Sequence, residues 1–72
     1  MYKVEIKLKQ ILDDRKITQK ELASLSGVRE ATISDIIRGT RTVINFNHLA
    51  SIAEALEIEN IEEIMVLTKL SD

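Results

Sequence analysis

The sequence predicts one compact, all-α domain of five short helices, and three observations lead to this prediction. Apolar residues recur at three- and four-residue spacing along most of the chain, which is typical of amphipathic helices. The chain has no proline, and its two glycines, Gly27 and Gly39, stand where helices would end. Its 72 residues suffice for one domain, to which we assign the range 1–72.

The first helix is expected at residues 7–15. Its inward side chains, at helical spacing, are Leu8, Ile11 and Leu12. Polar and apolar residues alternate just before it, at residues 2–7, with Val4 and Ile6 on one side. This alternating segment is either a short β-strand or the frayed start of the first helix.

The second helix has the clearest start signal in the chain. Thr18 at the N-cap and Glu21 three residues later form a capping box. Ile17 and Leu22 form a hydrophobic staple around the same cap, and Gly27 ends the helix. Its inner face is expected to comprise Leu22, Ala23 and Leu25.

Two further helices follow. The third is expected at about residues 29–38 and ends at Gly39. Its inward or partly inward residues are Ile33, Ile36 and Ile37. After a loop, Asn45 is a good N-cap for the fourth helix. The apolar stripe of that helix is formed by Leu49, Ile52, Ala53 and Leu56.

A final helix is expected after Asn60. Its inward residues are Ile61, Ile64 and Met65. The tail at residues 66–72 is either the frayed end of this helix or a short strand. As a strand it would pair with residues 2–6, in the same chain or in a second subunit.

The composition argues against several function classes. The chain has no cysteine and a single histidine, His48, so no disulfide, cysteine-based zinc site or nucleophile–base set is expected. We therefore expect no catalytic activity, no metal and no cofactor. Tyr2 and Phe46 are the only aromatic residues, too few to stack single-stranded nucleic acid. The sequence shows no apolar run of membrane length and no signal peptide, which favours a cytoplasmic protein without membrane contact.

The net charge of −2 is unevenly distributed along the chain. Residues 1–44 carry nine Lys or Arg and six Asp or Glu, a balance of +3. Residues 45–72 carry one Lys and six Asp or Glu, a balance of −5. This asymmetry suits a domain with one phosphate-facing surface. The glutamates of the second part, expected on a solvated face, are Glu54, Glu57, Glu59, Glu62 and Glu63.

The helices at 18–26 and 29–38 are joined by a short turn, Ser26-Gly27-Val28. Gly27 supplies the left-handed backbone conformation that such a sharp turn requires. The seam between the two helices is expected to be filled by Leu22, Val28, Ile33 and Ile36. This arrangement lets the first helix rest across a DNA backbone while the second enters the major groove.

Residues 18–39 resemble the helix-turn-helix of the lambda-repressor-like family of Cro/C1 type, also called XRE; they read TQKELASLSGVREATISDIIRG. Residues 45–58 resemble that family's fourth helix and read NFNHLASIAEALEI. The similarity runs from residue 8 to about residue 65. The glycine turn, TIS, the RG helix end and LASIAEAL occur together at fitting spacings, which makes the resemblance specific. It implies a DNA-binding regulator of transcription, such as a repressor.

The resemblance also implies which residues contact the bases. They lie on the exposed N-terminal part of the third helix and are Arg29, Glu30, Ala31, Ser34 and Asp35. Arg29 is suited to donate a bidentate pair to guanine, and Glu30 or Asp35 to accept from a cytosine amino group. Ala31 is suited to touch a thymine methyl group.

Phosphate contacts are implied at the start of the second helix, within the third helix and in the loop after it. The candidates are Gln19, Lys20, Thr32, Arg38, Thr40, Arg41 and Thr42. Gln19 matches the family position at which a side chain and a helix N-terminus meet one phosphate. Arg38 and Arg41 have an alternative role as cations that cap a helix C-terminus.

The sequence departs from the family pattern at three places. Arg29 replaces the usual small polar N-cap of the third helix, so its first turn loses a side-chain cap. Glu30 and Asp35 are acidic residues on the recognition face, although Asp35 has the alternative of pairing with a Lys or Arg on a neighbouring turn. Leu12 and Ile37 stand where many relatives have an interior ion pair, and this paired swap is a consistent apolar solution.

The sequence therefore predicts a sequence-specific regulator that binds double-stranded DNA as a homodimer. Its half-sites would lie about 34–36 Å apart, one helical turn of DNA. The dimer surface is expected at Ile61–Leu70 or at the N-terminal segment. The alternative is a protein-interaction module on the same fold, an antirepressor or antitoxin subunit with a regulatory protein partner, which the acidic recognition helix and net charge favour.

Overall fold

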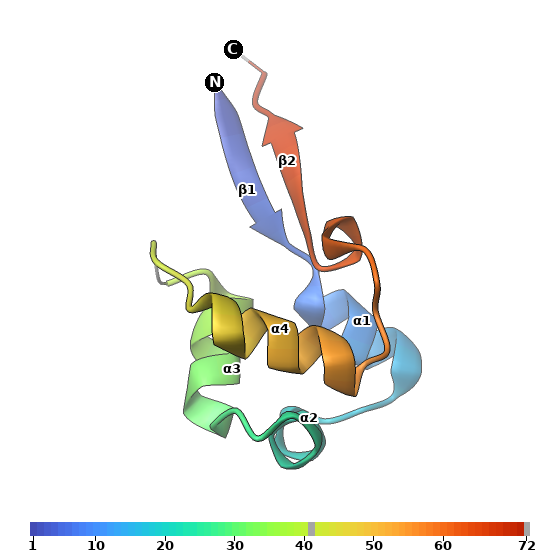
Figure 1. Cartoon of the computed structure of the whole chain (residues 1–72). Helices are drawn as coiled ribbons and strands as arrows, with labels where there is room; N and C mark the ends of the chain where they lie inside the picture. The colour runs from blue at the N-terminus through green and yellow to red at the C-terminus, as the bar shows by residue number, and fades with distance from the viewer. Residues whose placement is uncertain (41, 72) are drawn as a thin grey trace.

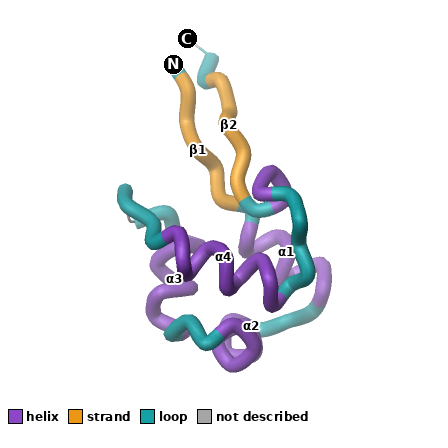
Figure 2. Tube along the Cα trace, viewed as in Figure 1, coloured by secondary structure: helices purple, strands orange, loops and turns teal. Residues whose placement is uncertain are grey.

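The computed structural model describes residues 1–40 and 42–71, which contain four α-helices, one 3₁₀ turn and two strands. The order is β1 (Tyr2–Ile6), α1 (Leu8–Arg15), α2 (Gln19–Ser26), α3 (Glu30–Arg38), α4 (Phe46–Ala55), η1 (Ile61–Glu63) and β2 (Met65–Lys69). The helices gather into one body, and β1 and β2 project from it side by side (Figure 1). Figure 2 shows that this projection, which we call the terminal ribbon, is the part built from strands. No helix among the described residues is long and apolar enough to cross a membrane.

The fold therefore has a mostly helical body, as predicted, but four helices in its described part rather than five. The final helix expected after Asn60 is replaced by the single 3₁₀ turn η1, and β2 begins at Met65. Ile64, between the two, is fully buried and fixes this point of the chain to the core. The residues that follow include β-branched Val66 and Thr68, which suit a strand better than a helix.

The terminal ribbon joins the two ends of the chain in an antiparallel pair. Tyr2 lies opposite Lys69, and Ile6 lies opposite Met65. Of the alternatives that the sequence left open, both terminal segments thus form strands, and they pair within one chain. At the base of the ribbon, the half-buried side chains of Ile6 and Met65 pack against the helical core.

The core is wholly aliphatic, as the scarcity of aromatic residues predicts. Its buried members are Leu8, Leu12, Leu22, Val28, Ile33, Ile36, Leu49, Ile52, Leu56, Ile58 and Ile64. Ile37 packs against this cluster, so the two residues predicted to replace an interior ion pair, Leu12 and Ile37, both contribute apolar surface to the interior. Leu25 and Ile61, which the sequence places inward, are 62% and 51% exposed. Leu22 and Ala23 suffice to cover the core from α2, because each helix presents only one stripe to it.

The predicted helix caps are formed. Glu21 N donates to Thr18 Oγ1 at 3.0 Å, and Thr18 N donates to Glu21 Oε1 at 3.2 Å, which completes the capping box. Asn45 Oδ1 accepts from the backbone of Asn47 at 2.8 Å at the start of α4. Arg29 makes no side-chain cap at α3, so the expected loss of that cap is confirmed.

We expect Thr18→Ala to lower the free energy of unfolding by about 1 kcal/mol, because it removes the oxygen that accepts from the first turn of α2. Urea denaturation followed by circular dichroism measures the loss. Ser24→Ala is the matched control, since Ser24 is exposed within the same helix and has no cap to lose. Its effect should stay within about 0.5 kcal/mol. Equal losses for the two variants would contradict a role for the capping box.

Candidate nucleic-acid interface

The turn between α2 and α3 has the geometry of a helix-turn-helix. Gly27 ends α2 with φ of 75°, in the left-handed region, and its N–H donates to the carbonyl of Ala23 at 2.9 Å. The backbone N–H of Val28 donates to Ser26 Oγ at 3.2 Å. The Val28 side chain is only 4% exposed and anchors the turn in the core. These contacts fix the angle at which α3 leaves α2.

α3 presents one side to the core and the other to solvent. Ile33 and Ile36 are buried on the inner side, as predicted. Arg29, Glu30 and Ala31 are exposed at its N-terminal end. Because no side chain caps this end, the first N–H groups of α3 have no such partner there. The structure thus brings three of the candidate base-contacting residues together beside unsatisfied backbone donors.

The other two base-contact candidates are less accessible. Ser34 and Asp35 are half-buried on α3. Arg38 Nη2 donates to Asp35 Oδ1 at 3.0 Å, so a predicted base contact and a predicted phosphate contact form an ion pair with each other. This confirms the alternative that Asp35 pairs with a cation on a neighbouring turn. The Thr40 hydroxyl donates to the carbonyl of Asp35 at 3.4 Å and ties the following loop to the end of the helix.

The start of α2 supplies a second cluster of backbone donors. The capping box satisfies the amides of Thr18 and Glu21. It leaves the amides of Gln19 and Lys20, the first two helical residues, without an intrahelical acceptor. The Lys20 side chain is exposed and that of Gln19 is half-buried. This helix end has the features of an anion site: outward N–H groups, the positive end of the helix dipole and a nearby cation.

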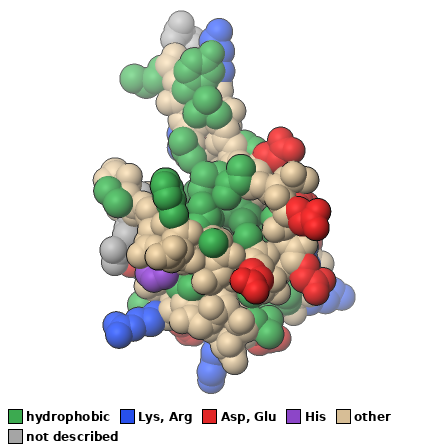
Figure 3. All heavy atoms as spheres, viewed as in Figure 1, with side chains coloured by type: hydrophobic (Ala, Val, Ile, Leu, Met, Phe, Trp, Pro, Cys, Tyr) green, Lys and Arg blue, Asp and Glu red, His purple; other side chains and the backbone are tan. Residues whose placement is uncertain are grey.

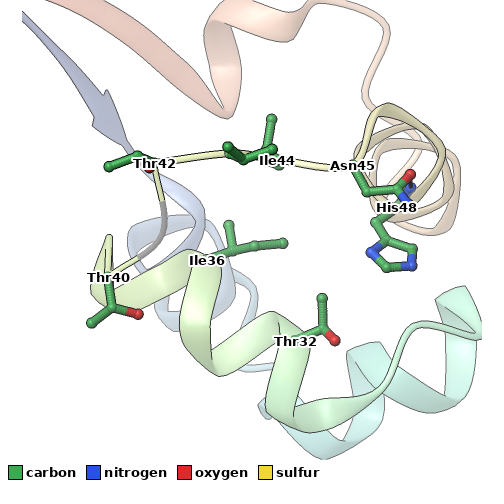
Figure 4. Close-up of a pocket in the computed structure, with 8 residues that line it drawn as sticks. Thr32, Ile36, Thr40, Thr42, Ile44, Asn45 and His48 are labelled. Atoms are coloured by element: carbon green, nitrogen blue, oxygen red, sulfur yellow. Dashed lines mark hydrogen bonds between the residues drawn. The ribbon is translucent and has the colours of Figure 1, made fainter.

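A pocket separates α3 from the start of α4 (Figure 4). Thr32 points from α3 toward it, and Asn45 and His48 lie on the other side. The sequence predicts Asn45 only as a helix cap, and it predicts no role for His48. Both residues follow the loop after α3 directly, and this position in the sequence is the signal that could have placed them near α3. Thr32 therefore faces the pocket rather than the exposed side of α3.

The loop after α3 is only partly described. Thr40 and Thr42 are exposed, and both line the pocket beside α4. Arg41, a predicted phosphate contact, lies outside the described residues. The five glutamates of the second part of the chain are all exposed, as expected. On the face in Figure 3, acidic side chains gather on the side of η1 and the end of α4, away from α3.

The comparisons with known proteins agree with this geometry. No curated protein and no solved structure matches the chain. A family model, described as the Cro/C1-type HTH DNA-binding domain, matches residues 7–69. That range contains the capping box, the Gly27 turn, α3 and α4, and it extends through β2. Because this match covers most of the chain, the chain belongs to the Cro/C1-type helix-turn-helix DNA-binding domain family.

Proposed function

We propose that this protein is a sequence-specific regulator of transcription that places α3 in the major groove of double-stranded DNA, as a homodimer. The observation that carries the proposal is the exposed, uncapped start of α3. Arg29 stands there beside free backbone donors, on the outer side of a helix whose inner side is locked in the core. A major groove admits one α-helix, and its base edges are read by side chains at this end of the helix.

In this proposal the residues of α3 and its N-cap each recognise a different chemical group on the bases. Arg29 donates to a guanine, and Glu30 accepts from a cytosine amino group. Ala31 touches a thymine methyl group, because its short side chain lets the helix approach closely. Ser34 contributes a hydroxyl deeper along the same face. A single helix reads few base pairs, so a symmetric dimer on a two-fold related site supplies the remaining specificity.

Phosphate contacts fix the position of α3 along the DNA. The amides of Gln19 and Lys20 bind one phosphate, with the Lys20 side chain adding charge. Thr40, Arg41 and Thr42 meet the backbone after α3. These contacts are independent of sequence, and they confer salt dependence because bound cations release counterions from DNA.

The ion pair between Asp35 and Arg38 resolves the apparent conflict of an acidic residue on the recognition face. Its 3.0 Å contact offsets the negative charge of Asp35, so the helix approaches phosphates with less repulsion. Arg38 is held over the same face and retains further N–H donors for a phosphate. We therefore assign Asp35 to positioning Arg38 rather than to reading a base.

The second candidate function is binding of a regulatory protein on the same fold. The exposed Glu30 and the net charge of −2 favour it, because acidic groups oppose DNA binding. The apolar side chains of Val43 and of Phe46 at the start of α4, each 80% exposed, add surface that a protein partner could cover. This candidate predicts a stable protein complex and little affinity for DNA.

Titration against duplexes from the region upstream of the gene separates the two functions. We expect tighter binding to one duplex than to a scrambled one, with affinity falling steeply as salt rises, because several phosphates are neutralised. Fluorescence anisotropy at two salt concentrations measures both effects. Absence of binding at low salt, with a co-purified protein partner retained, would favour the alternative.

Arg29→Ala and Lys20→Ala should have different kinds of effect on DNA binding. Loss of a bidentate contact to guanine is expected to cost about 1–3 kcal/mol on the specific site and to relax discrimination at one base pair. Loss of the Lys20 charge should weaken all duplexes similarly and reduce the salt slope by about 1. Anisotropy with single-base-substituted duplexes makes the comparison. If both variants bind every duplex like the parent, α3 and the start of α2 do not form the interface.

Asp35→Asn should raise affinity for scrambled DNA, because it removes a negative charge from the face that meets phosphate. Glu62→Gln is the control that removes one charge from η1, which lies away from α3 in Figure 1. We expect the control to change the affinity less. A loss of binding to the specific duplex in Asp35→Asn, confined to one base pair, would show instead that Asp35 reads that base.

A further inference from the structure

The outer edge of β1 carries unpaired backbone groups. The hydrogen bonds Leu70 N to Met1 O, at 2.8 Å, and Lys7 N to Ile64 O, at 2.6 Å, close the ribbon at its two ends. In an antiparallel ladder, hydrogen-bonded pairs alternate with non-hydrogen-bonded ones. The amides and carbonyls of Lys3 and Glu5 therefore face β2. Those of residues 2, 4 and 6 face away from it, along an open edge.

The ribbon also leaves apolar side chains exposed. Tyr2, Val4 and Leu67 share one face and are 63%, 56% and 68% exposed. Figure 3 shows hydrophobic side chains along the projecting ribbon and continuing onto the body at its base. A lone pair of strands is marginally stable in water, and further strands that extend an apolar face stabilise it. This ribbon is packed against helices only at its base.

Space for another strand lies beside this edge. Two pockets, of about 460 Å³ and about 320 Å³, adjoin β1, and Val4, Ile6 and Gly39 line both of them. Open space therefore separates the edge of β1 from the end of α3. Ile36 and Val43 form part of the far wall of the larger pocket, which is mostly apolar.

The charges on β1 specify which strand would fit. Lys3 lies opposite Thr68 and Glu5 lies opposite Val66, so neither faces an opposite charge within the ribbon. Neither forms an ion pair with another described residue. On an antiparallel strand of the same sequence, centred on Val4, each Lys3 would lie opposite a Glu5. The edge is therefore self-complementary in charge.

We propose that β1 pairs with β1 of a second copy of this chain and forms a four-stranded antiparallel sheet across a two-fold axis. Val4 pairs with the partner's Val4, and Tyr2 pairs with the partner's Ile6. The backbone groups of these residues exchange hydrogen bonds across the axis, and two Lys3–Glu5 pairs flank it. The partner's Tyr2 then lies beside Ile6, on the apolar face that lines the larger pocket.

The edge of β2 fits a second copy less well. A two-fold pairing of β2 centred on Leu67 would place Lys69 opposite the partner's Met65 and Val66 opposite the partner's Thr68. That arrangement provides no opposite charge for Lys69. It also leaves Lys3 and Glu5 without an opposite charge, whereas pairing through β1 places each of them opposite one.

This inference rests on the homodimer of the proposed function and names the surface that forms it. The long axis of the chain is 41 Å, and the strands account for about 17 Å of it. With the two-fold axis at Val4 and the bodies at opposite ends of the sheet, their centres are about 40 Å apart by the same strand rise. This separation is close to the roughly 34–36 Å between half-sites one helical turn apart.

Charge reversal tests the interface in the absence of DNA. Lys3→Glu places two like-charged pairs across the axis, and so does Glu5→Lys. Each should raise the dimer Kd about tenfold or more by sedimentation equilibrium, because like charges directly opposite destabilise paired strands. An equimolar mixture of the two variants restores opposite charges at both positions. It should form heterodimers with nearly the parental Kd, which native mass spectrometry identifies.

Lys69→Glu is the matched control, since it makes the same charge change on β2 and should leave the dimer Kd unchanged. A parent chain that stays monomeric at millimolar concentration overturns the inference. It is equally overturned if Lys69→Glu dissociates the dimer while Lys3→Glu does not, or if the mixture fails to associate. A chain that dimerises as described but binds no duplex leaves the inference standing and refutes the proposed function instead.

A disulfide provides a second, independent test, because the chain has no cysteine of its own. Paired Cα atoms in a hydrogen-bonded antiparallel pair lie about 5.5 Å apart, a distance that a disulfide spans. Val4→Cys should therefore yield a covalent dimer under mild oxidation, visible on a non-reducing gel. Leu67→Cys is similarly exposed on β2 and should cross-link far more slowly. Equal rates for the two variants would contradict pairing through β1.

Discussion

Burial of the aliphatic seam between α2 and α3 determines how the rest of this protein is arranged. Val28, Ile33 and Ile36 are held in the core, so the opposite side of α3 has to face outward. The turn at Gly27 sets the angle between the helices, and the capping box fixes where α2 begins. The core of this small domain contains no aromatic side chains, so close packing of branched aliphatic residues has to hold the helices in place. The exposed face is thus a consequence of the buried one.

Local signals in the sequence predicted most of the helical body. The capping box at Thr18, the left-handed glycines and the N-cap at Asn45 involve residues a few positions apart, so their energetics are readable without the fold. The end of α1 shows the limit of such signals. Lys16 ends it in the left-handed region, with φ of 57°, although no glycine marks the place. Arg15 donates to the carbonyl of Leu56, a contact across 41 positions that no local pattern predicts.

The C-terminal segment and the interface were harder to predict for the same reason. Residues after Asn60 have helical spacing, but pairing with β1 outweighs local preference and makes them a strand. The family resemblance predicts the interface at α2, the turn and α3, and the family match covers these elements. Only the folded structure shows that Asp35 and Arg38 contact each other and that Thr32 faces a pocket. Spacing of i and i+3 permitted the ion pair, but solvent exposure and rotamer decide whether it forms.

The terminal ribbon has a consequence for the order of events during synthesis. β1 is made before the four described helices and β2 after them, so their pairing joins residues far apart in the sequence. A nascent chain carries β1 without its neighbour until η1 and β2 have emerged. The helices, whose contacts are closer in sequence, can fold earlier and bring the two ends together. Completion of the ribbon therefore requires that synthesis has passed β2, and until then β1 lacks the strand that pairs with it.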